Sequence, residues 1–504
     1  MLLEPILSYI PYTCAADISQ VEIDRIEYDS RRAIDEGTLF VCLTGARLDG
    51  HNYARQVYER GCRTFLVSRP IELPADAVQI RTDDTRTALA LVSAEFYGRP
   101  AEKLHLIGIT GTKGKTSTAL MLQAILNGTG HPCAYIGSNG VVIRDRTIET
   151  VNTTPESRDL HSFFDIMVRE EVEYAVLEVS SQALAHSRVR GITFETTIFT
   201  NFSPDHISPV EHPDLADYMG AKARLFTEHT GRTVIYNADD PLWEEIVGGT
   251  SARKISCSVE SEADFSAWEI EPYRSRTALG IGFSCHAMGK QTSVQLLTPG
   301  EFSVQNALAA IAAAAQYGVH PADAAAILAH TPVRGRFEIV QALPERTFIL
   351  DYAHNGLSLR SALTVLREYH PDRLICLVGS VGGKSQNRRA ELGAAASALA
   401  DYCILTSDNP DYESPEGILE DILTHFDTKC PHTVIADREE AVRFAVRISR
   451  PGDILLLAGK GHETYQLIKG KKEPFSERAI ILEECAAIEE ELAEKKQAER
   501  LQTN

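Results

Sequence analysis

Several features that would assign a class at once are missing from this sequence of 504 residues. It has no uninterrupted apolar run of about 18 residues, which a membrane-spanning helix needs. Its N-terminus does not place a basic leader before a long apolar segment, so we expect no signal peptide and a cytoplasmic protein. Its ten cysteines include no C-x-x-C pair, which favours reduced thiols over a disulfide framework or a zinc site.

Positive charge is also scarce. Lys and Arg number 50 against 70 Asp and Glu, which gives a formal net charge of −20. A nucleic-acid partner requires a basic surface, so this balance argues against one. A few basic side chains can still form a local positive pocket, so small anionic ligands are compatible with the composition.

Length and pattern indicate three α/β domains. With 44% hydrophobic and 24% charged residues the composition is that of a globular protein, and the chain is too long for one core. Alternating strand-like and helix-like segments predict mainly parallel sheets. The expected domains cover residues 1–100, 101–332 and 333–504, with Gly98-Arg99-Pro100 as the first linker.

Polar residues follow the predicted strands of the last two domains. Strands at 174–177, 196–200 and 233–236 run into Glu178, Asn201 and Asn237, and strands at 347–350, 374–378, 402–406 and 453–457 run into further polar loops. Parallel α/β sheets bind ligands beyond the carboxyl ends of their strands, so we expect the sites there. Residues 258–300 predict an antiparallel addition, residues 302–317 a helix, and the tail after Ile481 a charged helix.

The central domain opens with a glycine-rich loop, Thr110-Gly111-Thr112-Lys113-Gly114-Lys115-Thr116-Ser117, between an apolar segment and helical spacing. In such a loop, backbone N–H groups and the positive end of the helix dipole face a phosphate. Lys115 is expected to reach the β- and γ-phosphates, and Thr116 to offer its hydroxyl to Mg²⁺. The common pattern G-x-x-x-x-G-K-[ST] has Gly where this chain has Ile109, so the loop is a variant, and a simple glycine turn is the alternative.

Nine motifs, in order along the chain, resemble those of the ATP-dependent Mur ligase family. They are TGTKGKTS at 110–117, NTTP at 152–155, LEVSS at 177–181, TNFSPDH at 200–206, AKARLF at 221–226, NADDP at 237–241, DYAHN at 351–355, SDNP at 407–410 and AGKGHE at 458–463. Their joint occurrence is far more specific than any one motif. Within the family, the chain most resembles the ligases that add the third residue of the peptidoglycan stem peptide.

This resemblance implies a three-domain α/β architecture, with a UDP-substrate-binding domain, a central P-loop ATPase-like parallel sheet and a C-terminal doubly wound, Rossmann-like ligase domain. The implied reaction joins a diamino acid, such as L-lysine or meso-diaminopimelate, to UDP-N-acetylmuramoyl-L-alanyl-D-glutamate. ATP and Mg²⁺ are the implied cofactors, and we expect a monomer. The alternatives are a relative of folylpolyglutamate or cyanophycin synthetase, a catalytically silent nucleotide-binding paralogue, and a P-loop switch or motor.

The family pattern also implies residues for ATP and metal. ATP would be bound by Gly111, Thr112, Lys113, Gly114, Lys115, Thr116, Ser117, Asn306, Arg336, Asp351 and His354, and Mg²⁺ by Thr116, Glu178 and His206. Lys115 and His206 are implied to be catalytic, as is Lys222, which matches a lysine that this family carbamylates. A carbamate turns a cation into an anion that can face a metal; the alternative is an ordinary helix-surface lysine.

Two further groups of residues are implied for the other substrates. The uridine-nucleotide pocket would contain Ser30, Asn152, Thr153, Thr154, Ser180, Arg188 and His186, which stands where the family often has Gln. The incoming amino acid would meet Arg389, Asp408, Asn409, Pro410, Asp411, Gly459 and Glu463.

Asp411 is the largest departure from the family pattern. Diaminopimelate-adding members read Asp-Asn-Pro-Arg, and that arginine would pair with the distal carboxylate of the acceptor. Here Asp411 follows Asp408-Asn409-Pro410. Coulomb repulsion makes Asp411 a poor partner for a carboxylate and a tolerable one for an ammonium group. This interpretation favours lysine or another diamino acid.

Overall fold

The computed structural model describes residues 1–45, 48–205, 207–208, 211–275, 279–340, 342–383 and 386–502. They form two compact units, the first made of Met1–Ser266 with Gln305–Ala324 and the second of Ala267–Val304 with Ala325–Asn504. All ten cysteines are free, as the sequence predicts. None of the helices in the described part of the chain is both long and apolar enough to cross a membrane.

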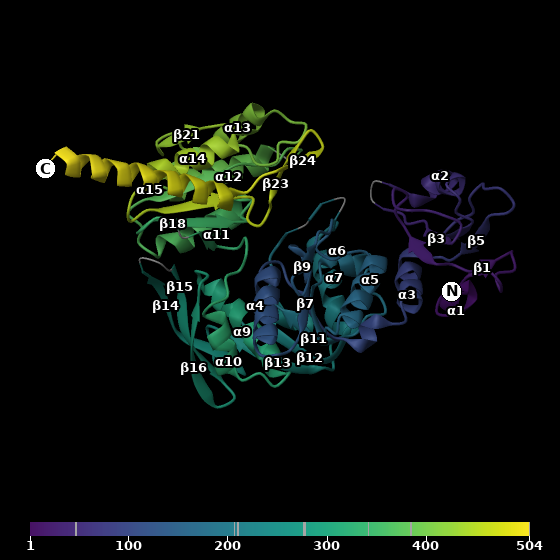
Figure 1. The fold of residues 1–504 in the computed structure, drawn as a ribbon. Helices are drawn as coiled ribbons and strands as arrows, with labels where there is room; N and C mark the ends of the chain where they lie inside the picture. The colour runs from purple at the N-terminus through teal and green to yellow at the C-terminus, as the bar shows by residue number, and fades with distance from the viewer. Residues whose placement is uncertain are drawn as a thin grey trace. The chain divides into compact units, whose positions relative to one another are not determined.

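The N-terminal part of the first unit is a small sheet with helices on both faces (Figure 1). The strands are β1 (Thr13–Cys14), β2 (Arg25–Glu27), β3 (Thr38–Val41), β4 (Thr64–Val67) and β5 (Val78–Arg81), in the order β1-β5-β4-β3-β2. The helices are α1 (Leu3–Leu7), α2 (Ala54–Glu59) and α3 (Thr85–Phe96), with 3₁₀ turns at Gly50–Tyr53 and Pro100–Lys103. Neighbouring residues of β3 enter opposite cores, Leu39 beside Leu89 and Phe40 beside Val57, so both faces are covered.

The central sheet of the first unit carries the glycine-rich loop. Its strands are β13 (Arg253–Ser258), β12 (Thr230–Asn237), β11 (Phe194–Phe199), β6 (His105–Thr110), β10 (Tyr174–Glu178), β7 (Cys133–Gly137), β8 (Gly140–Ile143) and β9 (Arg146–Ile148), in that spatial order. Strands β13 to β7 are parallel, as predicted, and β8 and β9 add an antiparallel edge that the sequence did not indicate. Helices α4 (Lys115–Gly128), α5 (Ser157–Arg169), α6 (Ser181–Ala185), α7 (Leu215–Glu228), α8 (Trp243–Val247), α9 (Glu301–Ala315) and α10 (Pro321–Leu328) complete this region.

Strand register brings the polar strand ends to one edge of this sheet. Glu178 pairs with Ile109, and Phe199 pairs with Thr110, so β10 and β11 end on either side of the glycine-rich loop. The expected gathering of site residues at the carboxyl ends of parallel strands is therefore present.

A three-strand segment follows the central sheet. Strand β14 (Phe265–Arg274) begins parallel to β13, with Phe265 opposite Cys257. Strands β15 (Leu279–Ala287) and β16 (Lys290–Leu296) form an antiparallel hairpin in the second unit. The predicted antiparallel addition is thus confirmed for β15 and β16.

The second unit is built on a six-stranded sheet in the order β17-β18-β22-β19-β20-β21, parallel except for β17. The strands are β17 (Glu338–Val340), β18 (Thr347–Asp351), β19 (Leu374–Val378), β20 (Tyr402–Leu405), β21 (His432–Val434) and β22 (Ile454–Ala458). The helices are α11 (Gly356–Arg367), α12 (Gln386–Leu399), α13 (Pro415–Leu423), α14 (Arg438–Ile448) and α15 (Glu477–Gln502), and β23 (Tyr465–Ile468) and β24 (Lys471–Pro474) form a separate hairpin.

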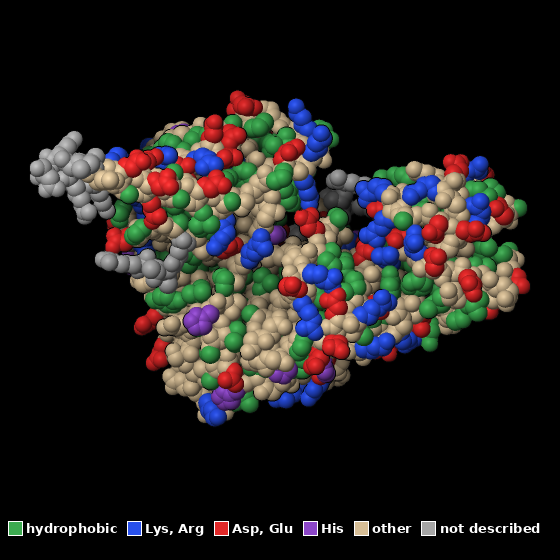
Figure 2. All heavy atoms as spheres, in the orientation of Figure 1, with side chains coloured by type: hydrophobic (Ala, Val, Ile, Leu, Met, Phe, Trp, Pro, Cys, Tyr) green, Lys and Arg blue, Asp and Glu red, His purple; other side chains and the backbone are tan. Residues whose placement is uncertain are grey.

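Both faces of this second sheet are buried, as a doubly wound sheet requires. Cys376 of β19 packs in the core that contains Leu363 of α11, while its neighbour Ile375 packs in the core that contains Val442 of α14. On the face of the molecule drawn in Figure 2, acidic and basic side chains are interspersed over the surface. This face therefore carries charges of both signs.

A buried ion pair joins the last helix to two strand ends of the second sheet. Arg438 is 1% exposed; its guanidinium donates to Glu477 of α15 at 2.9 Å and to the carbonyl oxygens of Ser407 and Ala458, each at 2.9 Å. Ser407 and Ala458 open the loops that carry the SDNP and AGKGHE motifs. Arg438 therefore fixes the positions of both loops.

We expect Arg438→Met to lower the free energy of unfolding by about 3–5 kcal/mol, because Glu477 would keep a buried charge without a partner. Urea unfolding measures this. The control is Arg55→Met on α2, an exposed arginine whose partner Glu59 is also exposed, with an expected loss below about 1 kcal/mol. Equal small losses in the two variants would contradict the account.

His161 of α5 should make the protein sensitive to acid. It is 1% exposed, its ring nitrogens have no hydrogen-bond partner among the described residues, and burial lowers its pKa from 6.5 to about 4. As the pH falls, His161 is therefore protonated in the unfolded chain before it is protonated in the folded protein. The free energy of unfolding is unaffected above the pKa of the unfolded chain and decreases as the pH falls towards the pKa of the folded protein. In His161→Leu, the decrease in unfolding free energy on acidification should be smaller by about 3 kcal/mol, which measurements of unfolding free energy against pH would show. An unchanged pH dependence would show that His161 is not responsible.

Candidate nucleotide and ligase site

The glycine-rich loop has the conformation that a phosphate cradle needs. Gly111 and Gly114 have φ angles of 153° and 82°, which favour glycine. A side chain at Gly111 would collide with the Thr200 hydroxyl, and one at Gly114 would collide with the amide oxygen of Asn306. The loop leads into α4, whose first-turn N–H groups have no intrahelical acceptor and can face an anion.

The segment after β11 holds this loop in place. The N–H of Thr112 donates to the Asn201 carbonyl and the N–H of Lys113 to the Asn201 side chain, both at 2.9 Å. The Thr200 hydroxyl donates to the Lys113 carbonyl at 2.6 Å. The loop is therefore preorganised by its neighbour in the sheet.

Two lysine side chains converge on one carbonyl oxygen of the loop. Lys115 and Lys222 each donate from Nζ to the oxygen of Gly111 at 2.8 Å. Lys222 is 1% exposed, and burial, followed by repulsion from Lys115, lowers its pKa well below the ordinary value. An anion at this point would relieve the repulsion, so the geometry suits a phosphate or a carbamate.

Glu178 and Thr116 form the part of the site that suits a divalent cation. Glu178 is fully buried at the end of β10; its Oε2 accepts the Thr116 hydroxyl at 3.0 Å, and its Oε1 accepts the Ser138 N–H at 3.1 Å. A carboxylate and a hydroxyl beside a phosphate loop are the oxygen ligands that Mg²⁺ prefers, so these residues fit the ion. His206, the third predicted ligand, lies outside the described residues.

The remaining residues predicted for ATP fall into two groups. In the first unit, Asn306 of α9 lies against Gly114 and accepts the Thr118 hydroxyl at 3.2 Å. In the second unit, Arg336 and His354 both contact the ring of Tyr352. The Arg336 Cζ atom lies 4.7 Å from the centre of this ring, and the centre of the His354 ring lies 4.8 Å from it. Asp351, the neighbour of Tyr352, is buried and accepts the N–H groups of Phe337 and Ala353 at 2.9 and 2.8 Å; burial raises its pKa and lowers that of His354.

Four of the residues predicted for the uridine-nucleotide substrate make hydrogen bonds close to Glu178. The Thr154 hydroxyl donates to the Glu178 carbonyl at 2.8 Å and accepts the Ser180 N–H at 3.0 Å. Arg188 donates to the Thr154 carbonyl at 3.0 Å, and the Thr153 hydroxyl is 3.1 Å from that of Ser138.

His186 and Ser30 stand apart from these hydrogen bonds. Burial, then the positive charges of Arg86 and Arg188, lower the pKa of His186 to about 4, so its ring is neutral near pH 7. The Ser30 carbonyl accepts a hydrogen bond from the guanidinium of Arg60, a contact within the N-terminal part of the first unit.

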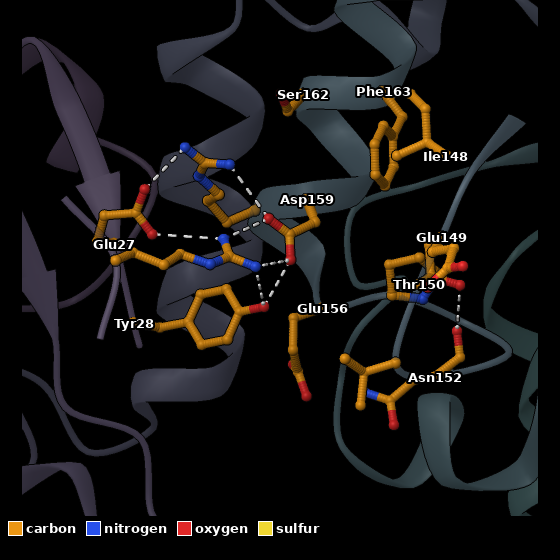
Figure 3. A pocket seen from close by; sticks show the side chains of 14 residues that line it. Glu27, Tyr28, Ile148, Glu149, Thr150, Asn152, Glu156, Asp159, Ser162 and Phe163 are labelled. Carbon is orange, nitrogen blue, oxygen red and sulfur yellow. Dashed lines mark hydrogen bonds and ion pairs between the residues drawn. The ribbon is translucent and has the colours of Figure 1, made fainter. Parts of the chain in front are cut away.

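A cavity of about 420 Å³ lies between the N-terminal sheet and helix α5, and Asn152 is part of its wall (Figure 3). On one side of the cavity, the Tyr28 hydroxyl donates to Asp159 at 2.5 Å, and Arg32 makes two bonds to the same carboxylate at 2.7 and 2.9 Å. These charged contacts, made across sequence separations of more than 100 residues, fix one wall of the cavity.

The residues predicted to meet the incoming amino acid gather in the second unit around Lys460. This side chain is fully buried and donates to the Asn409 oxygen at 2.9 Å, while Asp408 and Glu463 lie at 3.3 and 3.4 Å. Asn409 also donates to Glu463 at 2.9 Å. Gly459, with φ of 114°, brings its backbone against Asp408.

Arg389, Pro410 and Asp411 have structural contacts of their own. Arg389 is 1% exposed and donates to both oxygens of Glu413 at 2.6 and 2.7 Å, which lowers the pKa of Glu413 to about 2. The Pro410 carbonyl lies against Gly382, and the Asp411 side chain accepts the N–H of Gly470.

Three side chains that contact predicted site residues, two in the first unit and one in the second, were not predicted from the sequence. The Tyr135 hydroxyl donates to Glu178, the Tyr218 hydroxyl is 3.2 Å from that of Thr112, and Lys460 holds the second unit's loops. Tyr218 stands four residues before Lys222, a helical spacing that could have indicated a shared face. Lys460 lay within a recognised motif, and Tyr135 left no local signal.

Three family models match the chain. "Mur ligase family, catalytic domain" matches residues 22–97, "Mur ligase middle domain" matches 109–314, and "Mur ligase, glutamate ligase domain" matches 335–461.

Similar proteins bear the same kind of name. A "UDP-N-acetylmuramoyl-L-alanyl-D-glutamate--2,6-diaminopimelate ligase" of Caldanaerobacter subterraneus subsp. tengcongensis is 38% identical over 93% of this chain and 96% of its own. The protein of that name from Syntrophomonas wolfei subsp. wolfei is 36% identical over 92% of this chain and 94% of its own.

Solved structures agree with these relatives. A structure named for the same ligase has a TM-score of 0.69 at 25% identity and covers 97% of this chain and 99% of its own. A MurF ligase from Thermotoga maritima in complex with ADP, 16% identical over 95% of this chain and 99% of its own, has a TM-score of 0.60 and supports the fold alone. The predicted fold class and the predicted enzyme class, an ATP-dependent ligase, are confirmed. This chain belongs to the Mur ligase family.

Proposed function

We propose that this protein uses ATP to join a diamino acid to UDP-N-acetylmuramoyl-L-alanyl-D-glutamate during peptidoglycan synthesis. The names of relatives that match nearly the whole chain support the nucleotide substrate. One observation carries the ATP-dependent step. Lys115 and Lys222 both point at Gly111 in a glycine loop that is flanked by Glu178 and Thr116. This arrangement suits the handling of a terminal phosphate.

In the proposed reaction, a carboxylate oxygen of the D-glutamyl residue attacks the γ-phosphorus of ATP, and the bond to the ADP oxygen breaks. Lys115 and the N–H groups of the loop offset repulsion between the two anions. The amine of the acceptor then attacks the acyl phosphate, loses a proton, and expels inorganic phosphate to leave an amide. Mg²⁺, held by Thr116, Glu178 and nucleotide oxygens, would supply charge neutralisation at the phosphates.

Lys222 is proposed to react with carbon dioxide. Burial and the neighbouring Lys115 lower its pKa, which favours the neutral amine, and that amine can attack carbon dioxide to form a carbamate and release a proton. The negative carbamate would replace the repulsion between Lys222 and Lys115 with attraction. The modification remains a prediction for this chain.

ADP release tests the proposed function directly. The protein is supplied with ATP, Mg²⁺ and the UDP-linked dipeptide, with or without an amino acid from a panel that includes meso-diaminopimelate, L-lysine and L-ornithine. We expect ADP only when both the dipeptide and an acceptor are present. A silent paralogue would give no amine-dependent turnover, and a P-loop motor would hydrolyse ATP without the dipeptide.

Lys115→Ala should reduce kcat by roughly a hundredfold or more, because the developing charge on the transferred phosphoryl group loses its cation. The control is Lys103→Ala at an exposed lysine of the Pro100–Lys103 turn, which should retain wild-type activity. Initial rates of ADP formation measure both. Full activity in Lys115→Ala would refute the assignment of this lysine.

Arg188→Lys tests the proposed uridine-nucleotide site. Arg188 is 9% exposed and joins the Thr154 carbonyl to Glu156, contacts that a lysine cannot make together. We expect the KM for the UDP-linked dipeptide to rise by roughly tenfold and the KM for ATP to stay within about twofold. A change in both constants by the same factor would show a general loss of structure instead.

A further inference from the structure

The main chain of Asp411 is hydrogen-bonded to the β23–β24 hairpin. Its N–H donates to the Leu467 carbonyl, and its carbonyl accepts the N–H of Lys469, both at 2.9 Å. Asp411 has a φ angle of 54°, a left-handed conformation that Asp and Asn tolerate better than most residues. The backbone that carries this side chain is thus fixed by the hairpin.

The carboxylate of Asp411 is directed to the turn of the same hairpin. Its Oδ1 accepts the N–H of Gly470 at 2.6 Å. Ile468 pairs with Lys471, so Lys469 and Gly470 form a two-residue loop, and their φ angles of 49° and 78° are those of a type I′ turn. Such a turn favours Asn-Gly, whereas a lysine is strained in its first position, so an external acceptor helps to hold it.

The hairpin is also joined to the residues proposed to bind the acceptor. The side-chain oxygen of Asn409 accepts the N–H of Leu467 at 2.9 Å, and the Gln466 side chain donates to the Asp408 carbonyl at 2.9 Å. Lys460, which contacts Asn409, also donates to the carbonyl of Tyr465, the first residue of β23, at 2.8 Å. The order of the hairpin and the placement of Asn409 are therefore linked.

We propose that Asp411 is a positioning residue, which fixes the β23–β24 hairpin and through it Asn409 and Glu463, and that it does not select the acceptor by its charge. This inference rests on the proposed function. It replaces the electrostatic interpretation of Asp411 based on sequence, because the carboxylate already accepts a hydrogen bond from the protein's own backbone. The preference between L-lysine and meso-diaminopimelate then depends on other groups.

Three substitutions separate positioning from charge recognition. Asp411→Asn removes the charge but keeps a side-chain oxygen for Gly470, and Asn tolerates the same backbone conformation. Asp411→Ala removes both the charge and the oxygen. Asp411→Arg reverses the charge and restores the residue type of the diaminopimelate-adding pattern. The full-length protein is assayed for the KM of L-lysine and of meso-diaminopimelate, and for amide hydrogen exchange at Gly470.

If Asp411 positions the hairpin, Asp411→Ala raises the acceptor KM by roughly tenfold and speeds exchange at Gly470 by a similar factor, and Asp411→Asn largely restores both. Asp411→Arg raises the KM of both acceptors by the same factor. The proposal is overturned if Asn and Ala behave alike, or if Asp411→Arg switches the preferred acceptor. Absence of amine-dependent ADP release in the wild-type protein would defeat the proposed function instead, and exchange at Gly470 would still decide what Asp411 holds.

Discussion

Two lysine side chains that donate to one carbonyl oxygen set the chemistry of the first unit. Lys115 and Lys222 would repel each other at Gly111 unless one loses its proton or an anion enters, and burial of Lys222 makes the first outcome favourable. Two neighbouring lysines are compatible with a net charge of −20 because they form a local feature, in which Lys222 is buried. A terminal phosphate is the anion that this geometry suits.

Strand register determines that these groups can act together. Because Glu178 lies opposite Ile109 in a parallel pair, its carboxylate reaches the Thr116 hydroxyl at the start of α4. The neighbouring strand β11 leads into Asn201, which holds the loop from the other side. In the second unit, buried cations play the corresponding part, since Arg438 and Lys460 join loops that follow different strands. Each unit thus positions its polar loops with charges that solvent does not reach.

Much of this architecture could be predicted from local sequence pattern. The apolar run before Thr110 and the polar residue Glu178 after another apolar run predict parallel strands and their ligand-binding edge. The antiparallel strands β8 and β9 were not predicted, because short strands of three or four residues carry too little periodicity. The domain limits remain predictions. The individual site residues remain predictions as well, since neither a motif nor a fold shows what a side chain binds.

The hydrogen-bond and ion-pair partners of individual side chains could not be predicted from the sequence. Asp411 was interpreted by its charge alone, although its carboxylate accepts a hydrogen bond from Gly470, which lies 59 residues further along the chain. Arg389 was matched to acceptor binding, and the structure pairs it with Glu413 and Asp421. Such pairings depend on which loops the fold brings together, and a single sequence does not encode that information in any local pattern.

The central claim is that ATP activates a substrate carboxylate as an acyl phosphate. It is tested most directly with the UDP-linked dipeptide carrying a heavy oxygen isotope in the D-glutamyl γ-carboxylate. Mass spectrometry of the phosphate released during amide formation then follows the label. The account predicts one labelled oxygen in each phosphate molecule, because that oxygen leaves with the phosphoryl group when the amine attacks. Amide formation with no label in the phosphate would contradict it.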